Sequence, residues 1–82
     1  MDKKIKVACD EITRIFNLSG TEKHIVMLIS QGHSPKEISE IRDRSIETVR
    51  TQIKQIMHKF GVNRMNSIVL EVFRIANEKD KY

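Results

Sequence analysis

Four polar residues in the middle of the chain have the types and the spacing of a group that recognises bases in DNA. Glu47, Arg50, Thr51 and Lys54 recur three or four residues apart and would share one side of a helix. An arginine can donate two hydrogen bonds to guanine, a glutamate can accept one from cytosine, and a threonine can pack on the methyl group of thymine. The chemistry these residues could perform is therefore hydrogen bonding, with no covalent bond made or broken.

The same four residues also fit an ordinary solvated helix face. Glu47 and Arg50 are three residues apart, which suits a surface ion pair, so Glu47 could orient Arg50 instead of touching a base. Thr51 could equally be a plain surface threonine. The predicted helices around these residues are needed to choose between the two interpretations.

A helix that begins at Ser45 would position these side chains. Ser45 is a favourable N-cap residue, and Gly61 is a favourable residue for ending a helix. The other side of this helix carries an apolar stripe at spacings of three and four residues, formed by Val49, Ile53, Ile56 and Phe60. That stripe needs a core. The polar side, which also carries Gln55 and His58, would therefore face outward.

The segment before Ser45 has the pattern of a short helix followed by a tight turn. Residues 34–37, SPKE, form a capping box with proline at the first helical position, and this helix would end near Arg42. Asp43 and Arg44 then make the turn, because aspartate tolerates the left-handed conformation that such turns often need. A short helix, a tight turn and a longer basic helix form the helix-turn-helix pattern, whose second helix enters the major groove of DNA.

Three more helices complete an all-α prediction. One covers about residues 3–17, a second begins at the capping box of Ser19 and Glu22 and stops at Gly32, and the last runs over about residues 64–77. Five apolar residues share one face of the first of these helices, namely Ile5, Ala8, Ile12, Ile15 and Phe16.

Length and charge agree with a small binding domain. The chain has 82 residues, which suits one domain with a modest core and no room for a deep substrate pocket. Its formal net charge is +4, and residues 42–64 alone hold six basic residues against two acidic ones. The excess charge thus lies around the helix that begins at Ser45. A concentrated basic surface is typical of nucleic-acid binding, although it also fits a solvated helix face.

Nothing in the sequence indicates catalysis, a metal site or a membrane segment. No nucleophile is paired with a base. The three histidines, His24, His33 and His58, are not spaced from one another or from Cys9 as metal ligands are. The single cysteine, Cys9, cannot form an intramolecular disulfide, favours a reducing compartment, and is expected to be buried or half-buried. No stretch approaches the ~18 apolar residues of a membrane span. We therefore expect a cytoplasmic protein that is not an enzyme and needs no cofactor.

From Leu18 to about Ala76 the chain resembles the LuxR-type (GerE-like) DNA-binding domain of bacterial transcription regulators. The matching residues are Leu18-Ser19, Glu22, Gln31-Gly32-His33-Ser34, Lys36-Glu37-Ile38, Ser45, Thr48-Val49-Arg50-Thr51 and Gly61-Val62. The resemblance implies a four-helix helix-turn-helix domain over residues 18–77, preceded by an extra amphipathic helix in residues 1–17 and followed by a charged tail at residues 78–82. Most relatives carry a sensing or receiver domain upstream, where this chain has only about 17 residues. It therefore resembles the stand-alone members.

The resemblance also implies roles for individual residues. The positions that typically touch bases in relatives correspond to Arg50, Thr51 and Lys54. The positions near the phosphate backbone correspond to Thr48, Lys36 and Arg64.

Two arginines depart from the family pattern, because many relatives have apolar residues at these positions that seal the turn. They are Arg42 and Arg44. Arg44 could pair with Glu40 or Glu47, or it could contact a phosphate.

The last helix has two apolar stripes where a surface helix needs one. The first stripe is formed by Met65, Val69, Phe73 and Ala76. The second stripe, formed by Ile68, Val72 and Ile75, suggests a dimer interface with the same helix of a second copy, as the last helix of the family commonly provides. Alternatively, the first helix could cover this helix completely. The first helix itself could cap the core, extend the dimer interface, or bind a different regulator.

These observations predict a sequence-specific transcription regulator that binds double-stranded DNA as a homodimer on an inverted repeat. We expect it in the cytoplasm, associated with the nucleoid, with RNA polymerase or another regulator as further partners. Two alternatives stay open. A module like the fourth region of bacterial sigma factors would recognise an asymmetric promoter element without self-dimerisation. An interaction protein would use its apolar surface to sequester a related regulator.

Overall fold

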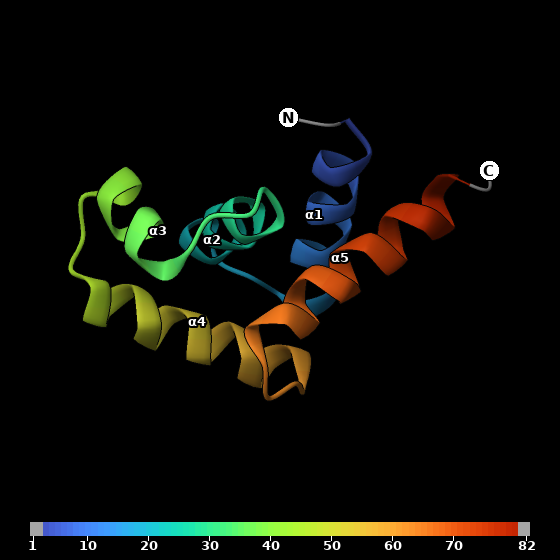
Figure 1. Cartoon of the computed structure of the whole chain (residues 1–82). Helices are drawn as coiled ribbons and strands as arrows, with labels where there is room; N and C mark the ends of the chain where they lie inside the picture. Colours follow the sequence, from blue (N-terminus) through green and yellow to red (C-terminus); the bar gives the residue numbers. More distant parts are fainter. Residues whose placement is uncertain (1–2, 81–82) are drawn as a thin grey trace.

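The structure, a computed structural model, describes the backbone of residues 3–80 and the side chains of residues 3–78. Within that range it contains five helices and no strand: α1 (Lys3–Phe16), α2 (Gly20–Ser30), α3 (Pro35–Arg42), α4 (Ile46–Phe60) and α5 (Met65–Asp80) (Figure 1). The all-α prediction is therefore confirmed. The predicted N-terminal segment (residues 1–17) and the predicted tail (residues 78–82) each include two residues, 1–2 and 81–82, that lie outside the described residues.

Local signals account for the helix starts. At α2 the N–H of Ser19 donates to Glu22 Oε1 (2.9 Å), and the N–H of Glu22 donates to Ser19 Oγ (3.1 Å). Ser34 and Glu37 form the same reciprocal pair at α3, at 2.9 Å and 3.2 Å. Both predicted capping boxes are thus present, and each satisfies two N–H groups that a helix start would otherwise leave unpaired.

The helix α5 extends beyond its predicted end. Residues 78–80, which were expected to belong to a charged tail, continue the helix to Asp80. Arg74 supports this last part because its guanidinium pairs with Glu78 one turn later, and with Glu71 one turn earlier.

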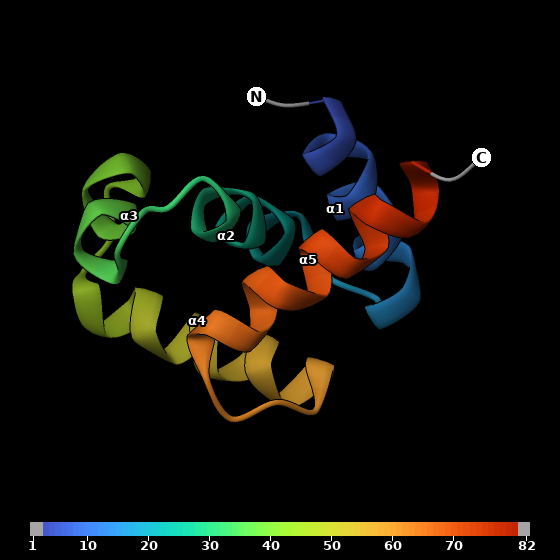
Figure 2. The same cartoon turned by 45° about the vertical axis from the view of Figure 1, so that its right-hand side comes forward.

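The core lies where α1, α2 and α5 meet above α4. The helix α1 packs chiefly on α5, and the two helices lie side by side in Figures 1 and 2. From α1 the core receives Ala8, Cys9 and Ile12, which are all buried. From α4 it receives Val49, Ile53 and Ile56, three of the four predicted stripe residues, while Phe60 is partly buried.

The predicted dimer stripe on α5 is wrong. Its residues are buried inside the chain, with Ile68 and Val72 at 0% and Ile75 at 5% exposure, so a second copy cannot contact them in this fold. The physical reason is that α1, α2 and α4 all pack on α5, with α1 as its main neighbour. The other stripe is only partly covered: Ala76 is buried, Met65 and Val69 pack against the core, and Phe73 is 44% exposed.

Two other apolar residues are more exposed than their helical position indicated. Ile15 on the predicted buried face of α1 is 51% exposed, and Ile41 on α3 is 49% exposed. Each lies close to the end of its helix, where fewer neighbours are available to cover it.

The ends of α1 and α4 are joined by an aromatic contact. The rings of Phe16 and Phe60 stack with their centroids 4.4 Å apart and an angle of 23° between their planes. Next to this pair, the N–H of Leu18 donates to the carbonyl of Thr13 (3.0 Å), which closes the end of α1. The first helix is therefore packed on both α5 and the far end of α4.

Cys9 is buried in the layer between α1 and its neighbours, as expected. Burial raises the pKa of its thiol to about 11. Because the thiolate is the reactive form, the side chain is inert at neutral pH and acts as a small apolar core residue.

Candidate nucleic-acid interface

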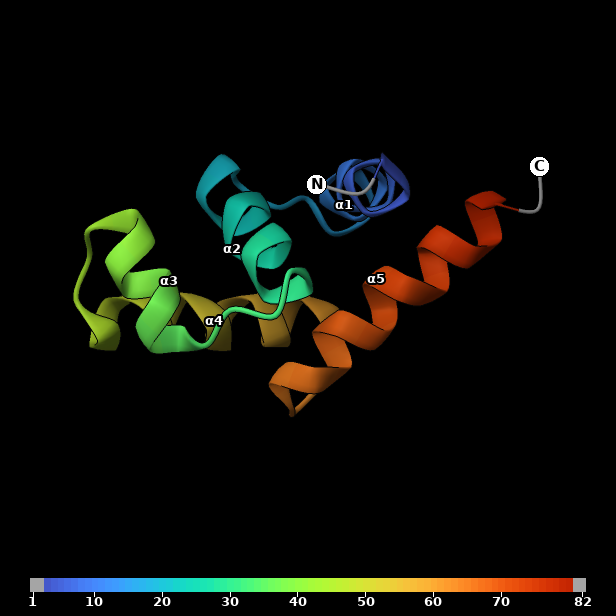
Figure 3. The ribbon, with the colours of Figure 1, turned by 45° about the horizontal axis from the view of Figure 1, so that its top comes forward.

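The turn between α3 and α4 sets the direction in which α4 leaves. Asp43 adopts the left-handed conformation with φ +53°, as predicted for this turn. The N–H of Arg44 then donates to the carbonyl of Ser39 (2.9 Å), which ties the turn back to α3. Ser45 caps α4 by accepting a hydrogen bond from the N–H of Thr48 (3.1 Å). In Figure 3, α3 lies across the first half of α4, the arrangement of a helix-turn-helix.

Ser39 is small where the two helices approach, as the sequence indicated. It is buried, and its hydroxyl donates to the carbonyl of Lys36 (2.6 Å), so the short helix hides no unpaired hydroxyl.

The structure brings the four predicted base-contact residues together on the exposed side of α4. Glu47, Arg50, Thr51 and Lys54 are all exposed, while the opposite side of the helix is in the core. Among the described residues, neither Glu47 nor Arg50 has a hydrogen-bond or ion-pair partner. The surface ion pair between them, which was the alternative interpretation, is therefore not formed.

A narrow groove of about 250 Å³ runs beside Arg50 and Lys54, between the start of α3 and the start of α5. Both residues line it, together with Pro35 and Met65. We call it the α3–α5 groove. Lys36 and Arg64, two of the residues assigned to phosphate contacts, are exposed and lie next in sequence to Pro35 and Met65.

Thr48, a third residue assigned to a phosphate contact, is exposed in the first turn of α4. Its hydroxyl accepts a hydrogen bond from Ser45 Oγ (2.8 Å). The hydroxyl proton of Thr48 is therefore free to be donated to an acceptor outside the chain.

The two unusual arginines behave differently. Arg42 turns back to α2, where its guanidinium contacts His24 Nδ1 and donates to Thr21 Oγ1 (3.4 Å), while its Nε is buried without a partner. Arg44 is exposed and donates to the carbonyl of Asp43 (3.1 Å). It pairs with neither Glu40 nor Glu47 in the described residues, so of its predicted roles the phosphate contact is the one left open.

One lysine of the basic segment is not available to DNA. Lys59 Nζ donates to Glu22 Oε1 (2.7 Å) and to the carbonyl of Asn17 (3.2 Å). Burial by itself would raise the pKa of the Glu22 carboxyl, but the hydrogen bonds from Lys59 and Ser19 outweigh it and hold that pKa below its usual value. The ion pair fastens the end of α4 to the start of α2.

Two exposed residues of α4 received no role from the sequence. They are Gln55 and His58, which lie four and seven residues after Thr51 and share its side of the helix. That spacing was the only signal for them, and it was visible in the sequence.

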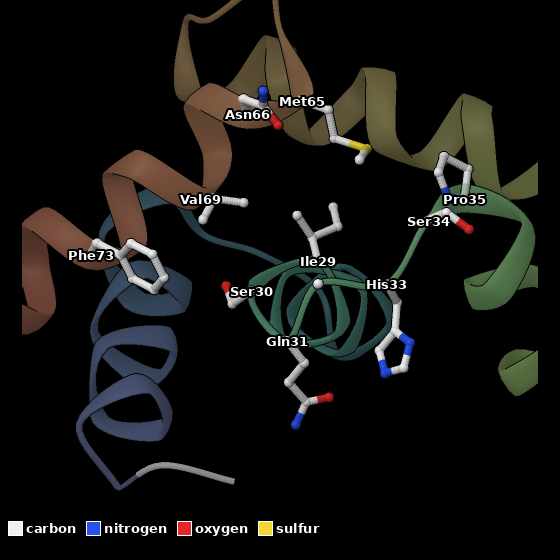
Figure 4. A pocket seen from close by; sticks show the side chains of 11 residues that line it. Ile29, Ser30, Gln31, His33, Ser34, Pro35, Met65, Asn66, Val69 and Phe73 are labelled. Atoms are coloured by element: carbon white, nitrogen blue, oxygen red, sulfur yellow. The ribbon is translucent and has the colours of Figure 1, made fainter.

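A second and larger groove shares Pro35 and Met65 with the α3–α5 groove and continues along α5 to Phe73. It has a volume of about 560 Å³ and separates the turn at residues 30–34 from the first half of α5. In Figure 4 the ring of Phe73 stands at one end, Met65 points toward Pro35 at the other, and Ile29 and Val69 line the middle. We call it the α2–α5 groove.

The described residues contain neither a metal site nor a membrane-spanning helix. No group of three or more His, Cys, Asp or Glu side chains in residues 3–78 could hold a metal ion. None of the helices between residues 3 and 80 is long and apolar enough to cross a membrane.

The model of the bacterial regulatory proteins of the luxR family, GerE, matches residues 16–72. That region covers most of the chain and includes α2, α3, α4 and half of α5. The chain belongs to the luxR family. The resemblance inferred from the motifs is thereby confirmed, and α1 lies almost entirely outside the matched region.

Membership of the luxR family makes this protein a DNA-binding transcription regulator with a helix-turn-helix. The family is generally non-enzymatic. No curated protein and no solved structure gives a significant match to the chain.

Proposed function

We propose that this luxR-family regulator binds duplex DNA as a homodimer on an inverted repeat, with one α4 helix in each of two successive major grooves. The observation that carries the proposal is the outer side of α4. It presents Glu47, Arg50, Thr51 and Lys54 to solvent without partners, on a helix whose other side is held in the core. Side chains that are free and rigidly mounted can exchange water for base edges at little cost.

Residues around α4 supply the sequence-independent part of binding. Lys36 and Arg64 are exposed and adjoin in sequence Pro35 and Met65, which line the α3–α5 groove. Thr48 lies at the start of α4, and Arg44 is exposed in the turn. Contacts from these residues to phosphates would fix the register of α4 on the duplex and make the affinity salt-dependent.

The dimer contact in this proposal uses a different side of α5 from the one expected from the sequence. Leu70 is 66% exposed and Phe73 is 44% exposed, which leaves two large apolar side chains uncovered on one short stretch of helix. Asn66 and Asn77 are exposed on the same side, one turn before and one turn after them. An apolar centre with a polar rim at both ends suits a two-fold contact, in which the same patch meets itself.

The size of the molecule is compatible with this arrangement. Its longest dimension is 40 Å. The proposal requires the two α4 helices to lie about 34 Å apart, one turn of DNA, a spacing of the same order as this dimension. We expect the dimer to act at promoters in the cytoplasm, on the nucleoid, where RNA polymerase or another regulator would be its protein partner.

The experiment is selection of binding sites from random duplexes at moderate salt, with the wild-type chain and with the substitutions Arg50→Ala and Lys36→Ala. We expect an inverted repeat. Arg50→Ala should cost about 1–3 kcal/mol and relax the preference at one base of each half-site, whereas Lys36→Ala should weaken all sequences alike.

Three outcomes would count against the proposal in different ways. If no site is enriched, direct recognition fails and the sequestration alternative gains support. If an asymmetric site is enriched by a monomer, the sigma-like alternative is favoured. If the preference survives Arg50→Ala unchanged, α4 does not contact bases through this residue.

A further inference from the structure

Gln55 lies on the crest of α4, in line with the residues of the proposed base contact. Two shallow hollows flank the exposed side of this helix. One is lined by Glu22, Thr51, Lys54, Gln55, His58 and Lys59, and the other by Ser45, Glu47, Thr48, Thr51, Gln52 and Gln55. Thr51 and Gln55 are the two residues that border both hollows. Thr51 and Gln55 therefore lie on the ridge between the two hollows. A surface that binds α4 would contact this ridge first.

The side-chain amide of Gln55 is free. The residue is exposed, and it has no hydrogen-bond partner among the described residues. An amide has one acceptor and two donor hydrogens, which is the pattern complementary to the N7 acceptor and the N6 donor of adenine in the major groove. Lysine or arginine at this position would instead be suited to guanine.

The position of Gln55 along the helix defines which base it can reach. It is five residues after Arg50, which corresponds to about 7.5 Å along the helix axis. With about 3.4 Å between successive base pairs, the two side chains are separated by roughly two base pairs.

We propose that Gln55 is a specificity-determining residue that contacts an adenine about two base pairs from the base contacted by Arg50. The half-site then includes more base pairs than the first turns of α4 could contact alone. This inference rests on the proposed function, because it requires α4 to lie in the major groove.

The test is site selection followed by measurement of affinity for single-base variants of the selected duplex. Gln55→Ala should reduce the discrimination in favour of adenine at one position about tenfold, and leave the base contacted by Arg50 unchanged. Gln55→Glu should shift the preference at the same position toward cytosine, because a carboxylate accepts from its amino group. Gln52→Ala is the matched control, since Gln52 lies on the same helix but is half-buried on its flank. It should alter no base preference.

The outcomes separate this inference from the proposed function. If the wild type selects a site and Gln55→Ala changes no base preference, only the role of Gln55 is overturned. If Gln55→Ala weakens all duplexes equally, the residue contacts the phosphate backbone, and base recognition by Gln55 is likewise overturned. If the wild type selects no site, the proposed function fails and the role of Gln55 fails with it.

Discussion

The helices α4 and α5 are nearly equal in length. Each has one side in the core and one side near solvent, yet the sequence predicted the buried side correctly only for α4. On α4 one side is apolar and the other polar, so burial of the apolar side leaves a single choice. On α5 two apolar stripes lie next to each other, and only their neighbours decide which is buried. Those neighbours are α1, α2 and α4, which together bury Ile68 and leave Phe73 44% exposed. Periodicity identifies the residues that share a face, but it does not identify the face that is covered.

The largest expected effect tests the two sides of α5 against each other. Ile68 is fully buried, whereas Leu70 on the other side is 66% exposed. Ile68→Ala should lower the free energy of unfolding by about 2–5 kcal/mol, because it leaves a cavity in the core. Leu70→Ala should change it by less than about 0.5 kcal/mol. Urea denaturation of the two variants measures both values at a protein concentration where the chain is monomeric. Equal losses would mean that the sides of α5 are wrongly assigned.

The next effect concerns association through the uncovered side of α5. The double substitution Leu70→Lys and Phe73→Lys places two cations in each half of the proposed contact, so the dimer should weaken by more than about 2 kcal/mol. Sedimentation at micromolar concentration measures the mass. Ile41→Lys is the control, because Ile41 on α3 is an apolar residue whose exposure, 49%, lies between those of Phe73 and Leu70. A wild-type chain that is monomeric at these concentrations would contradict the dimer directly.

A smaller effect tests how the end of α4 is fastened to α2. Glu22 has a lowered pKa, so its contribution to stability is complete above the pKa of the unfolded chain and is lost as the pH falls through the folded value. Glu22→Gln should cost about 1–2 kcal/mol at pH 7. The difference from the wild type should shrink once the pH falls below the unfolded pKa of about 4.3, and it should disappear only below the lower pKa of the folded chain.

Glu37→Gln is the matched control for that measurement. Glu37 occupies the same place in the capping box of α3, but it is exposed and has no lysine partner among the described residues. Its replacement should cost less than that of Glu22. Unfolding curves at several pH values would show a pH-independent loss for Glu22→Gln if the pair with Lys59 contributes nothing.

The parts of the fold that could be predicted are those determined by neighbouring residues. The capping boxes at Ser19 and Ser34, the left-handed turn at Asp43 and the end of α4 at Gly61 all depend on contacts within a few residues. The exposure of Glu47, Arg50, Thr51 and Lys54 on one side of α4 was predictable for the same reason, because it follows from one helical period.

The parts that could not be predicted depend on residues far apart in the chain. Arg42 contacts a histidine 18 residues before it, and Lys59 pairs with a glutamate 37 residues before it. Spacing along a single helix contains no information on such pairs. The packing of α1 on α5 is of the same kind, and it is the reason the dimer stripe was wrongly predicted.

The stacking of Phe16 on Phe60 has a consequence for anyone who moves this domain into another protein. A fragment cut after residue 17 would contain the whole helix-turn-helix, yet it would lose the ring that stacks on Phe60 and the helix that is the main neighbour of α5. The unit that can be transferred is therefore larger than the helix-turn-helix, and a fusion should keep the whole of α1 attached.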